Sequence, residues 1–384
     1  MLHFTQAEFD TRLARAQTAI SSASLDGILL FAPESHFWLT GYDTFGFAMF
    51  QCMVVPASGD PHLLTRAPDL LQAQQTSTLP RQNIHIWKDI EGVNPAAHLV
   101  RLISDLGLSG KTLGWETRTV GLTTWNGDLV RTALKGIATL EEASDLISLL
   151  RRDKSEQEIA YHVRAAELSD DALDAALAIT QAGAFEGDIL AAMQGAVFKG
   201  GGDYAGNEFI IGSGEAALLC RYQSGRRTLD AQNQMTLEWS GAYARYHAAM
   251  MRTLVIGRAN DVQKKMHAAA VAALQACEDA IRPGAPMGDV FDAHARVFDA
   301  HDLSHARLNA CGYGMGAIYN PIWVDFPMFY EGNPLVMNEG NVFFLHMILM
   351  DADTRLAMCW GHSVLVTNDG VKRLSRSPLD LIEC

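Results

Sequence analysis

The sequence predicts an α+β protein built from two domains. Its 384 residues exceed what a single hydrophobic core usually serves, so two domains are expected. Residues 1 to 152 alternate short apolar runs with helical or polar segments, which indicates a small α/β domain. From residue 153 to 384 the pattern changes to paired strands with helices segregated between them. That second pattern is typical of an α+β domain rather than a parallel wound sheet.

The first domain is expected to begin with an amphipathic helix. The segment FTQAEFDTRLARAQTAISSASLDG carries apolar residues at helical spacing and ends in glycine. Short apolar runs bounded by polar segments then predict strands at GILLFA, CMVVPASGDPHLL, IHIWKDI and TLGWE.

The second domain is expected to open with a long helix. Ser155 and Glu158 have the spacing of a capping box, and an apolar stripe follows them. Beyond this helix the pattern predicts strands at 207–212, 235–240, 243–256, 342–350 and 356–367. Two further helices, near 260–281 and 287–302, separate the early strands from the late ones.

Composition excludes several classes of partner. The formal charge is -14 and no basic run is present, which argues against nucleic-acid binding. No apolar run reaches the ~18 residues that a membrane helix needs, and the N-terminal residues lack a leader pattern. The six cysteines are scattered without CxxC spacing, as in a protein with reduced thiols. We therefore expect a cytoplasmic protein, with neither nucleic acid nor membrane as partner.

A carboxylate interrupts an apolar run in the stretch MTLEWSGAYARYHAAMMRT. Glu238 lies inside the first of two predicted strands, where acidic residues are rarely tolerated. On an alternating strand its side chain faces either solvent or a pocket. The following strand carries the polar side chains Tyr243, Tyr246, His247 and Arg252. A carboxylate opposite such groups can form a site for acid–base chemistry.

Three other segments carry candidate site residues. In NACGYGMGAIYNPIW, alternating glycines let the backbone pass close to another strand or a ligand, and Tyr313 projects from between them. The apolar runs NVFFLHMILM and AMCWGHSVLVTNDG each contain one histidine, His346 and His362 respectively. Each of these histidines is either a satisfied core residue or part of a site.

The order of these segments resembles the pita-bread fold of the creatinase, prolidase and methionine-aminopeptidase superfamily. The resemblance covers essentially the whole chain. RRDKSEQEIAYHVRAAELSD is similar to that superfamily's domain-entry helix, and the first domain is similar to its creatinase-type N-terminal domain. The resemblance implies a creatinase-type α/β domain over residues 1–152 and a pita-bread catalytic domain over residues 153–384.

The peptidases of this superfamily hold two metal ions with two Asp, one His and two Glu. The corresponding residues here are Glu238, Ala249, Tyr313, His346 and Gly361, with His362 beside the last. Two divalent cations need several anionic oxygens, and one carboxylate does not supply them. We therefore expect neither a metal nor another cofactor.

The chain resembles more closely the branch that works without metal, namely creatinase and especially ectoine hydrolase. The similar segments are PESHFWLTGYDTFGFAMFQCMVVP, LEWSGAYARYHAAMMRT and CGYGMGAIYNPIW. The resemblance places the family's catalytic glutamate, which attacks a cyclic amidine carbon, at Glu238. It implies a metal-independent hydrolase of a small-molecule C–N bond, with Glu238 as nucleophile or base.

The resemblance also suggests roles for other residues. His247, His346 and His362 are candidates for proton transfer, because histidine titrates near neutral pH. Tyr313 would donate a hydrogen bond to developing charge. Substrate binding is expected from Tyr246 and from a cation, Arg221 or Arg252, that pairs with a substrate carboxylate.

The chain departs from the ectoine-hydrolase pattern at two places. Cys220 and Arg221 replace a Pro-His pair, and an acidic residue of the relatives is missing near His362. Both changes shift the charge of the pocket toward positive. They favour a more anionic substrate or a different C–N bond.

The family resemblance further implies a homodimer. In such dimers the N-terminal domain of one subunit covers the active site of the other. Four aromatic residues would then form walls for a small ligand: Trp38, Tyr42, Phe47 and Phe50.

Two other functions fit the same pattern. Glu238, His346 and His362 could hold one Zn or Fe for a reaction like that of an Xaa-Pro dipeptidase. Against this set, His362 lies one residue out of the ligand register, and the period of two in a strand turns it to the other face. Alternatively, the scaffold could bind a ligand without catalysis.

Overall fold

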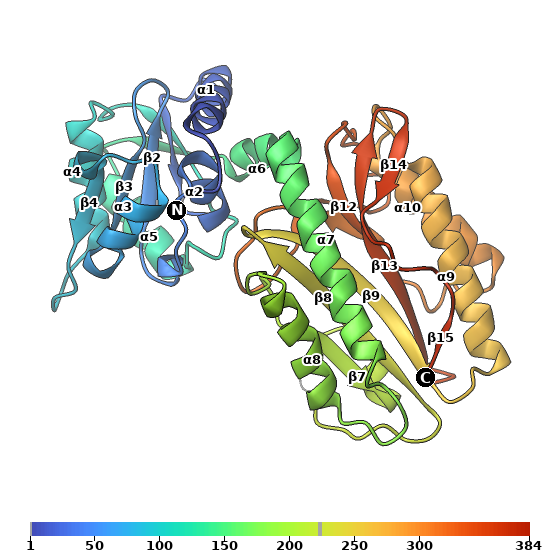
Figure 1. Cartoon of the computed structure of the whole chain (residues 1–384). Helices are drawn as coiled ribbons and strands as arrows, with labels where there is room; N and C mark the ends of the chain where they lie inside the picture. Colours follow the sequence, from blue (N-terminus) through green and yellow to red (C-terminus); the bar gives the residue numbers. More distant parts are fainter. Residues whose placement is uncertain (1, 222–224) are drawn as a thin grey trace. The chain divides into compact units, whose positions relative to one another are not determined.

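The computed structural model describes residues 2–221 and 225–384. The chain divides into two compact units, Met1–Arg151 and Arg152–Cys384 (Figure 1). Each unit has its own sheet and its own hydrophobic cores.

Within residues 2–151, six strands form one sheet in the order β4-β3-β2-β1-β5-β6. The strands are β1 (Gly27–Leu30), β2 (Cys52–Pro56), β3 (His62–Arg66), β4 (Ile84–Trp87), β5 (Thr112–Trp115) and β6 (Thr139–Glu142). The helices are α1 (Gln6–Ser22), α2 (Pro33–Thr40), α3 (Leu70–Thr76), α4 (Pro95–Asp105), α5 (Thr124–Leu134) and α6 (Ser144–Arg152). Strand β1 pairs antiparallel with β2 and parallel with β5, so the sheet is mixed.

One segment predicted as a single strand forms a hairpin. CMVVPASGDPHLL contains β2 and most of β3, which pair antiparallel. Gly59 lies between them with a φ of 102°, a conformation that L side chains rarely adopt. The run of apolar residues on both sides of this turn concealed the break.

Nine strands form one sheet within the described part of the second unit, residues 152–221 and 225–384. Its main path runs β11-β10-β12-β13-β9-β8-β7, with β14 beside β13 and β15 beside β9. The strands are β7 (Ile210–Ser213), β8 (Asn233–Tyr243), β9 (Tyr246–Ile256), β10 (Gly312–Gly314), β11 (Asp325–Met328), β12 (Val342–Asp351), β13 (Leu356–Thr367), β14 (Gly370–Arg373) and β15 (Ile382–Glu383). The helices are α7 (Glu156–Leu177), α8 (Glu186–Lys199), α9 (Asp261–Ala280) and α10 (Met287–Ala300).

The predicted capping box opens α7. The Ser155 side chain accepts from the Glu158 backbone N–H, and the Glu158 carboxylate accepts from the Ser155 backbone N–H at 2.8 Å. Two free N–H groups at the helix start are thereby satisfied. No helix in the described ranges is long and apolar enough to cross a membrane.

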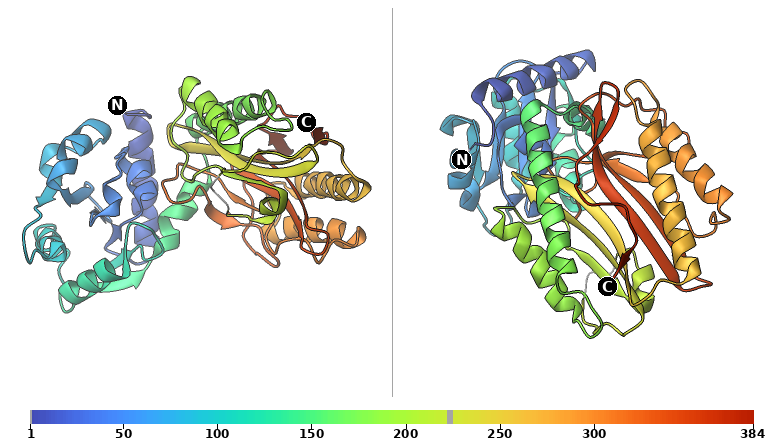
Figure 2. Two further views of the ribbon diagram at one scale, coloured as in Figure 1. Left: turned by 90° about the horizontal axis from the view of Figure 1, so that it is seen from below. Right: turned by 45° about the vertical axis from the view of Figure 1, so that its right-hand side comes forward.

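The helices of the second unit pack on one face of its sheet, which we call the helix-covered face. Tyr246 of β9 points there, since its hydroxyl donates to Glu158 of α7 at 2.7 Å. Arg252 lies on the same face of β9 and is in register with Trp360 of β13. The Trp360 ring packs at 4.7 Å against His267 of α9. Helices α7 and α9 therefore cover the same face (Figure 2), and we call the opposite one the open face.

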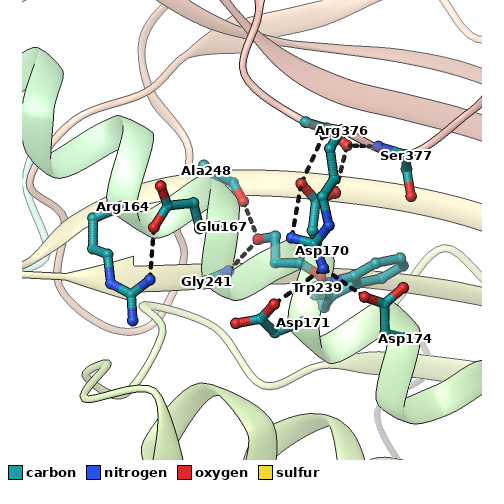
Figure 3. Close-up of polar contacts among 12 residues, drawn as sticks. Arg164, Glu167, Asp170, Asp171, Asp174, Trp239, Gly241, Ala248, Arg376 and Ser377 are labelled. Carbon is teal, nitrogen blue, oxygen red and sulfur yellow. Dashed lines mark hydrogen bonds and ion pairs between the residues drawn. The ribbon is translucent and has the colours of Figure 1, made fainter.

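Hydrogen bonds fasten α7 to strands β8 and β9 (Figure 3). Trp239 Nε1–H donates to the Ser169 carbonyl at 2.9 Å, and the Ser169 hydroxyl accepts from Gly241 N–H at 2.6 Å and donates to the Ala248 carbonyl at 2.5 Å. A side chain at Gly241 would lie 2.1 Å from the Ala165 carbonyl oxygen, so this close approach requires glycine. Because Trp239 points toward α7, its neighbour Glu238 points to the open face.

Candidate active site

A cavity of about 530 Å³ lies on the open face of the second unit. Its polar lining comes from Asn207, Cys220, Arg221, Glu238, Asn309, Tyr313 and His346. Its apolar walls include Leu308, Ile322, Trp323, Val324, Met328 and Ile348. A largely apolar hollow with a few convergent polar groups is the usual form of a small-molecule site.

Glu238 is the acidic group of this cavity. Burial raises the pKa of its carboxyl group to about 7, while the Arg221 cation and a hydrogen bond with Tyr313 oppose that rise. The carboxyl group therefore exchanges its proton near neutral pH. A group with this property can act as base in one step and as acid in the next.

Tyr313 reaches the cavity from β10, between two glycines that bring this strand close to its neighbours. A side chain at Gly312 would lie 2.3 Å from the Phe344 carbonyl oxygen, and one at Gly314 would lie 2.6 Å from that of Phe326. The glycine pattern thus serves strand packing. The Tyr313 hydroxyl accepts from Trp323 Nε1–H at 2.9 Å. Burial and the Glu238 charge raise the pKa of Tyr313 well above its ordinary value, so the phenol stays protonated.

His346 lines the same cavity from β12, but it does not titrate near neutral pH. Burial, together with the Arg221 cation, lowers its pKa to about 4. Burial likewise lowers the pKa of His247 to about 4 and lowers that of His362. Desolvation thus favours the neutral imidazole at all three positions, and the proton-transfer roles expected of these histidines stay predictions. In this cavity the group near neutrality is Glu238.

Two residues of the YARYH run at 243–247, Tyr246 and His247, support the scaffold. Tyr246 points to the helix-covered face, where it bonds to Glu158 as described above. His247 is fully buried, and its Nε2 accepts from the Gly206 N–H at 2.8 Å. Gly206 precedes Asn207, which lines the cavity. His247 thus holds a loop at the edge of the cavity, and neither residue is part of the lining.

Arg252 and His362 also lie on the helix-covered face. The Arg252 guanidinium stacks 4.8 Å from the Trp360 ring centroid and donates to the Gly361 carbonyl at 2.6 Å. His362 Nε2 lies 2.7 Å from Glu278 Oε1 of α9. The structure therefore separates both residues from Glu238, and of the two candidate cations it places Arg221 in the cavity.

The four aromatic residues proposed as ligand walls belong to the first unit. Three of them pack inside its own cores, namely Trp38, Tyr42 and Phe50. Phe47 is 7% exposed, with its ring centroid 5.3 Å from that of Phe45. Little of these side chains is available to a ligand. The apolar surface of this segment comes instead from Phe45 and Met49, which are 68% and 47% exposed.

Sequence reasoning missed Trp323 and gave Cys220 no role. Trp323 ends the glycine-rich segment that carries Tyr313, but no local signal shows that its indole bonds to that tyrosine. Cys220 precedes Arg221, lines the cavity and places its Sγ 3.2 Å from Met350 Sδ. The Glu238 charge contributes to raising the pKa of the Cys220 thiol, after burial.

The residues at the metal-ligand positions of the peptidases do not fit a metal centre. The cavity offers one carboxylate, a neutral histidine and the Arg221 cation, which opposes a dication. Among residues 2–221 and 225–384, no three His, Cys, Asp or Glu side chains are placed to hold a metal ion. The set of Glu238, His346 and His362 is not assembled, because His362 points to the opposite face.

Comparison with known proteins agrees with the fold. The model of metallopeptidase family M24 matches residues 160–368, and that of the creatinase/prolidase N-terminal domain matches residues 12–152. The chain is 28% identical to an uncharacterised hydrolase/peptidase of Sinorhizobium fredii, over 100% of this chain and 99% of the relative. It is 25% identical to the ectoine hydrolase of Halomonas elongata, over 99% and 98%.

A solved structure shows the same architecture. Dipeptidase PepE from Mycobacterium ulcerans superposes with a TM-score of 0.85 at 23% identity, covering 99% of both chains. The predicted fold class and the predicted superfamily are thus confirmed. The M24 model spans more than half of the 384 residues. The chain therefore belongs to metallopeptidase family M24, a family of hydrolases, and carries its creatinase/prolidase N-terminal domain.

Proposed function

We propose that this protein is a metal-independent hydrolase of a small-molecule C–N bond in a cyclic amidine, a guanidino compound or an amide. The observation that carries the proposal is Glu238. Its carboxyl group lines an apolar-walled cavity and has a pKa of about 7. The similarity to a relative named ectoine hydrolase over nearly the whole chain is in keeping with this function.

The carboxylate suits the substrate and the reaction. An amidinium group spreads positive charge over N–C–N, and ionised Glu238 is its natural counter-ion. As a base, Glu238 takes a proton from water, whose oxygen bonds to the central carbon while the C=N electron pair moves onto nitrogen. Protonated Glu238 then returns the proton to the leaving nitrogen as the C–N bond breaks, and the proton of the new hydroxyl group passes to the released amine as the amide C=O forms. Amidinium and water thus become amide and ammonium.

Glu238 can also act as a nucleophile. One of its oxygens then bonds directly to the central carbon while the C=N electron pair moves onto nitrogen, and the C–N bond breaks as the amine leaves with a proton. Water then attacks the resulting acyl adduct, its oxygen becomes the amide oxygen, and the Glu238 carboxylate is released. In both routes we propose that Arg221, which lines the cavity, pairs with a substrate carboxylate. Tyr313 lowers the pKa of Glu238 and so favours its charged form.

A substrate screen with matched variants tests the proposal. The compounds are cyclic amidines, guanidino acids, small amides and Xaa-Pro dipeptides, with the metal content of the protein measured in parallel. Glu238→Gln should lower kcat/KM by about 10²-fold or more, since it removes the base or nucleophile. Glu208→Gln, at an exposed carboxylate outside the cavity, serves as control and should be neutral.

Three outcomes contradict the proposal. Hydrolysis of dipeptides that requires added metal would indicate a peptidase. Full turnover by Glu238→Gln would remove the assigned residue. Tight binding of a screened compound by both forms, with no turnover by either, would indicate a binding protein.

The same proposal includes the cellular location, the oligomeric state and the partner of the enzyme. All six cysteines are free, which suits the reducing cytoplasm. We propose a homodimer in which the N-terminal domain of each subunit covers the active site of the other, as the family resemblance implies. A small molecule, rather than nucleic acid or a membrane, is the proposed partner.

A further inference from the structure

A hydrogen bond links Trp323 and Tyr313 in the wall of the cavity that holds Glu238. Trp323 and Tyr313 are 2% and 5% exposed, and the indole Nε1–H donates to the phenolic oxygen at 2.9 Å. Both residues line the cavity together with Glu238. The Tyr313 ring is held from the side by Phe344 and His346, with ring centroids at 5.4 and 5.6 Å.

The hydrogen atoms available on these groups determine which group donates and which accepts. An indole N–H can only donate, and a phenol has a single hydrogen. Because the Tyr313 oxygen accepts from Trp323, its own hydrogen is free to point at another acceptor. Tyr313 and Glu238 line the same cavity. Tyr313 lowers the pKa of the Glu238 carboxyl group, and the Glu238 charge raises that of the phenol, so Glu238 is the acceptor toward which the phenolic hydrogen can point.

We propose that Trp323 is a positioning residue that acts on Glu238 through Tyr313, by turning the single phenolic hydrogen toward the carboxylate. The effect of Trp323 on turnover rests on the proposed function of Glu238. The orientation of the hydroxyl group does not, because it needs no substrate.

This arrangement favours the ionised form of Glu238. A carboxylate accepts the phenolic hydrogen, whereas a protonated carboxyl group would prefer to donate its own hydrogen to the tyrosine oxygen. Trp323 already occupies an acceptor position on that oxygen and disfavours the second arrangement. Without the indole N–H, the hydroxyl can rotate and accept from protonated Glu238, so the pKa of Glu238 should rise.

The test measures the pKa of Glu238 without turnover. The unfolding free energy is measured as a function of pH for each protein, wild type or variant, and for the same protein carrying Glu238→Gln in addition. The difference between the two curves reports the titration of Glu238 in that protein. In the Trp323→Phe background the pKa should rise by about one unit, the size expected for weakening a hydrogen bond to a charged group. Tyr313→Phe should produce a rise of at least this size, and adding Trp323→Phe to it should change the pKa no further.

Trp239→Phe is the matched control. Trp239 is also fully buried and donates its Nε1–H at 2.9 Å, but to the Ser169 carbonyl on the helix-covered face. It should lower stability while leaving the pKa of Glu238 in place. If Trp323→Phe does not fold, β-(3-benzothienyl)alanine at position 323 keeps the shape of the indole and replaces its N–H by sulfur.

The titration decides this inference separately from the proposed function. An unchanged pKa of Glu238 in the Trp323 variants would overturn the inference, as would a shift in Trp323→Phe that adds to the shift in Tyr313→Phe. With a substrate in hand, the acid limb of kcat/KM should move upward by the same amount as the pKa. If no compound is hydrolysed while the pKa shift is found, the proposed function fails and the positioning role stands.

Discussion

Glu238 joins two properties that oppose each other. Its chemistry needs a carboxyl group that exchanges protons near neutral pH, and burial in the cavity provides this by raising the pKa to about 7. The same burial disfavours the ionised form in the folded protein. Activity and stability should therefore respond in opposite directions when this side chain is replaced.

The pH dependence of stability should reveal this conflict. The pKa of the Glu238 carboxyl group is near its ordinary value of 4.5 in the unfolded chain and about 7 in the folded one. Between these values the folded state binds more protons, so the contribution of Glu238 to stability falls as pH rises. Glu238→Gln should be about 1–3 kcal/mol more stable than the wild type at pH 8 and less than about 1 kcal/mol more stable at pH 5. Urea denaturation at both pH values measures this, and an equal gain at both would contradict it.

At the scale of elements, the period of two in each strand distributes the candidate residues. On β8, Trp239 bonds to α7 while Glu238 faces the cavity. On β13, His362 bonds to α9 while the neighbouring Gly361 belongs to the open face. Successive residues of a strand thus point alternately to the core and to the site. The face that the helices cover becomes the core, and the other face carries the site.

Ser169 fastens α7 to the strand that carries Glu238. Ser169→Ala removes a buried hydroxyl that bonds to Gly241 and Ala248, and leaves the Gly241 N–H without this acceptor. The variant should lose about 1–3 kcal/mol of unfolding free energy. Ser21→Ala, at an exposed helical serine of the first unit, is the control and should change little. A loss in Ser169→Ala no larger than the control's, measured by urea denaturation, would show that this fastening is unimportant.

At the scale of the whole molecule, the two units have separate hydrophobic cores. The first unit's cores absorb Trp38, Tyr42 and Phe50, so any partner contact of this segment falls to its exposed side chains. Phe45 is the most exposed aromatic residue there. In the proposed dimer, Phe45 is therefore the residue of this segment expected to contact the partner subunit.

Light scattering coupled to size exclusion should give a mass twice that of the 41.9 kDa chain. Phe45→Ser should weaken the dimer or raise KM, because it removes apolar surface expected at the partner's active site. Trp125→Ser replaces an aromatic residue that is 74% exposed elsewhere in the first unit, and should do neither. A monomeric wild type, or equal behaviour of the two variants, would count against the proposed dimer.

Much of the architecture follows from the sequence alone. The capping box of Ser155 and Glu158, the long paired strands and the two later helices were predicted near the positions the structure has. These features depend on local chemistry, on capping groups and on hydrophobic periodicity, which neighbouring residues determine. The resemblance of whole segments to the superfamily predicted the family and placed the catalytic glutamate at Glu238.

Only the tertiary structure decided the makeup of the site. Strand register sent Arg252 and His362 to the helix-covered face, and burial made His346 a neutral residue. The contact between Trp323 and Tyr313 joins two residues ten positions apart through the fold of the intervening loop. Direction, burial and long-range contact depend on how strands and helices pack against one another, and no single segment of the sequence contains that information.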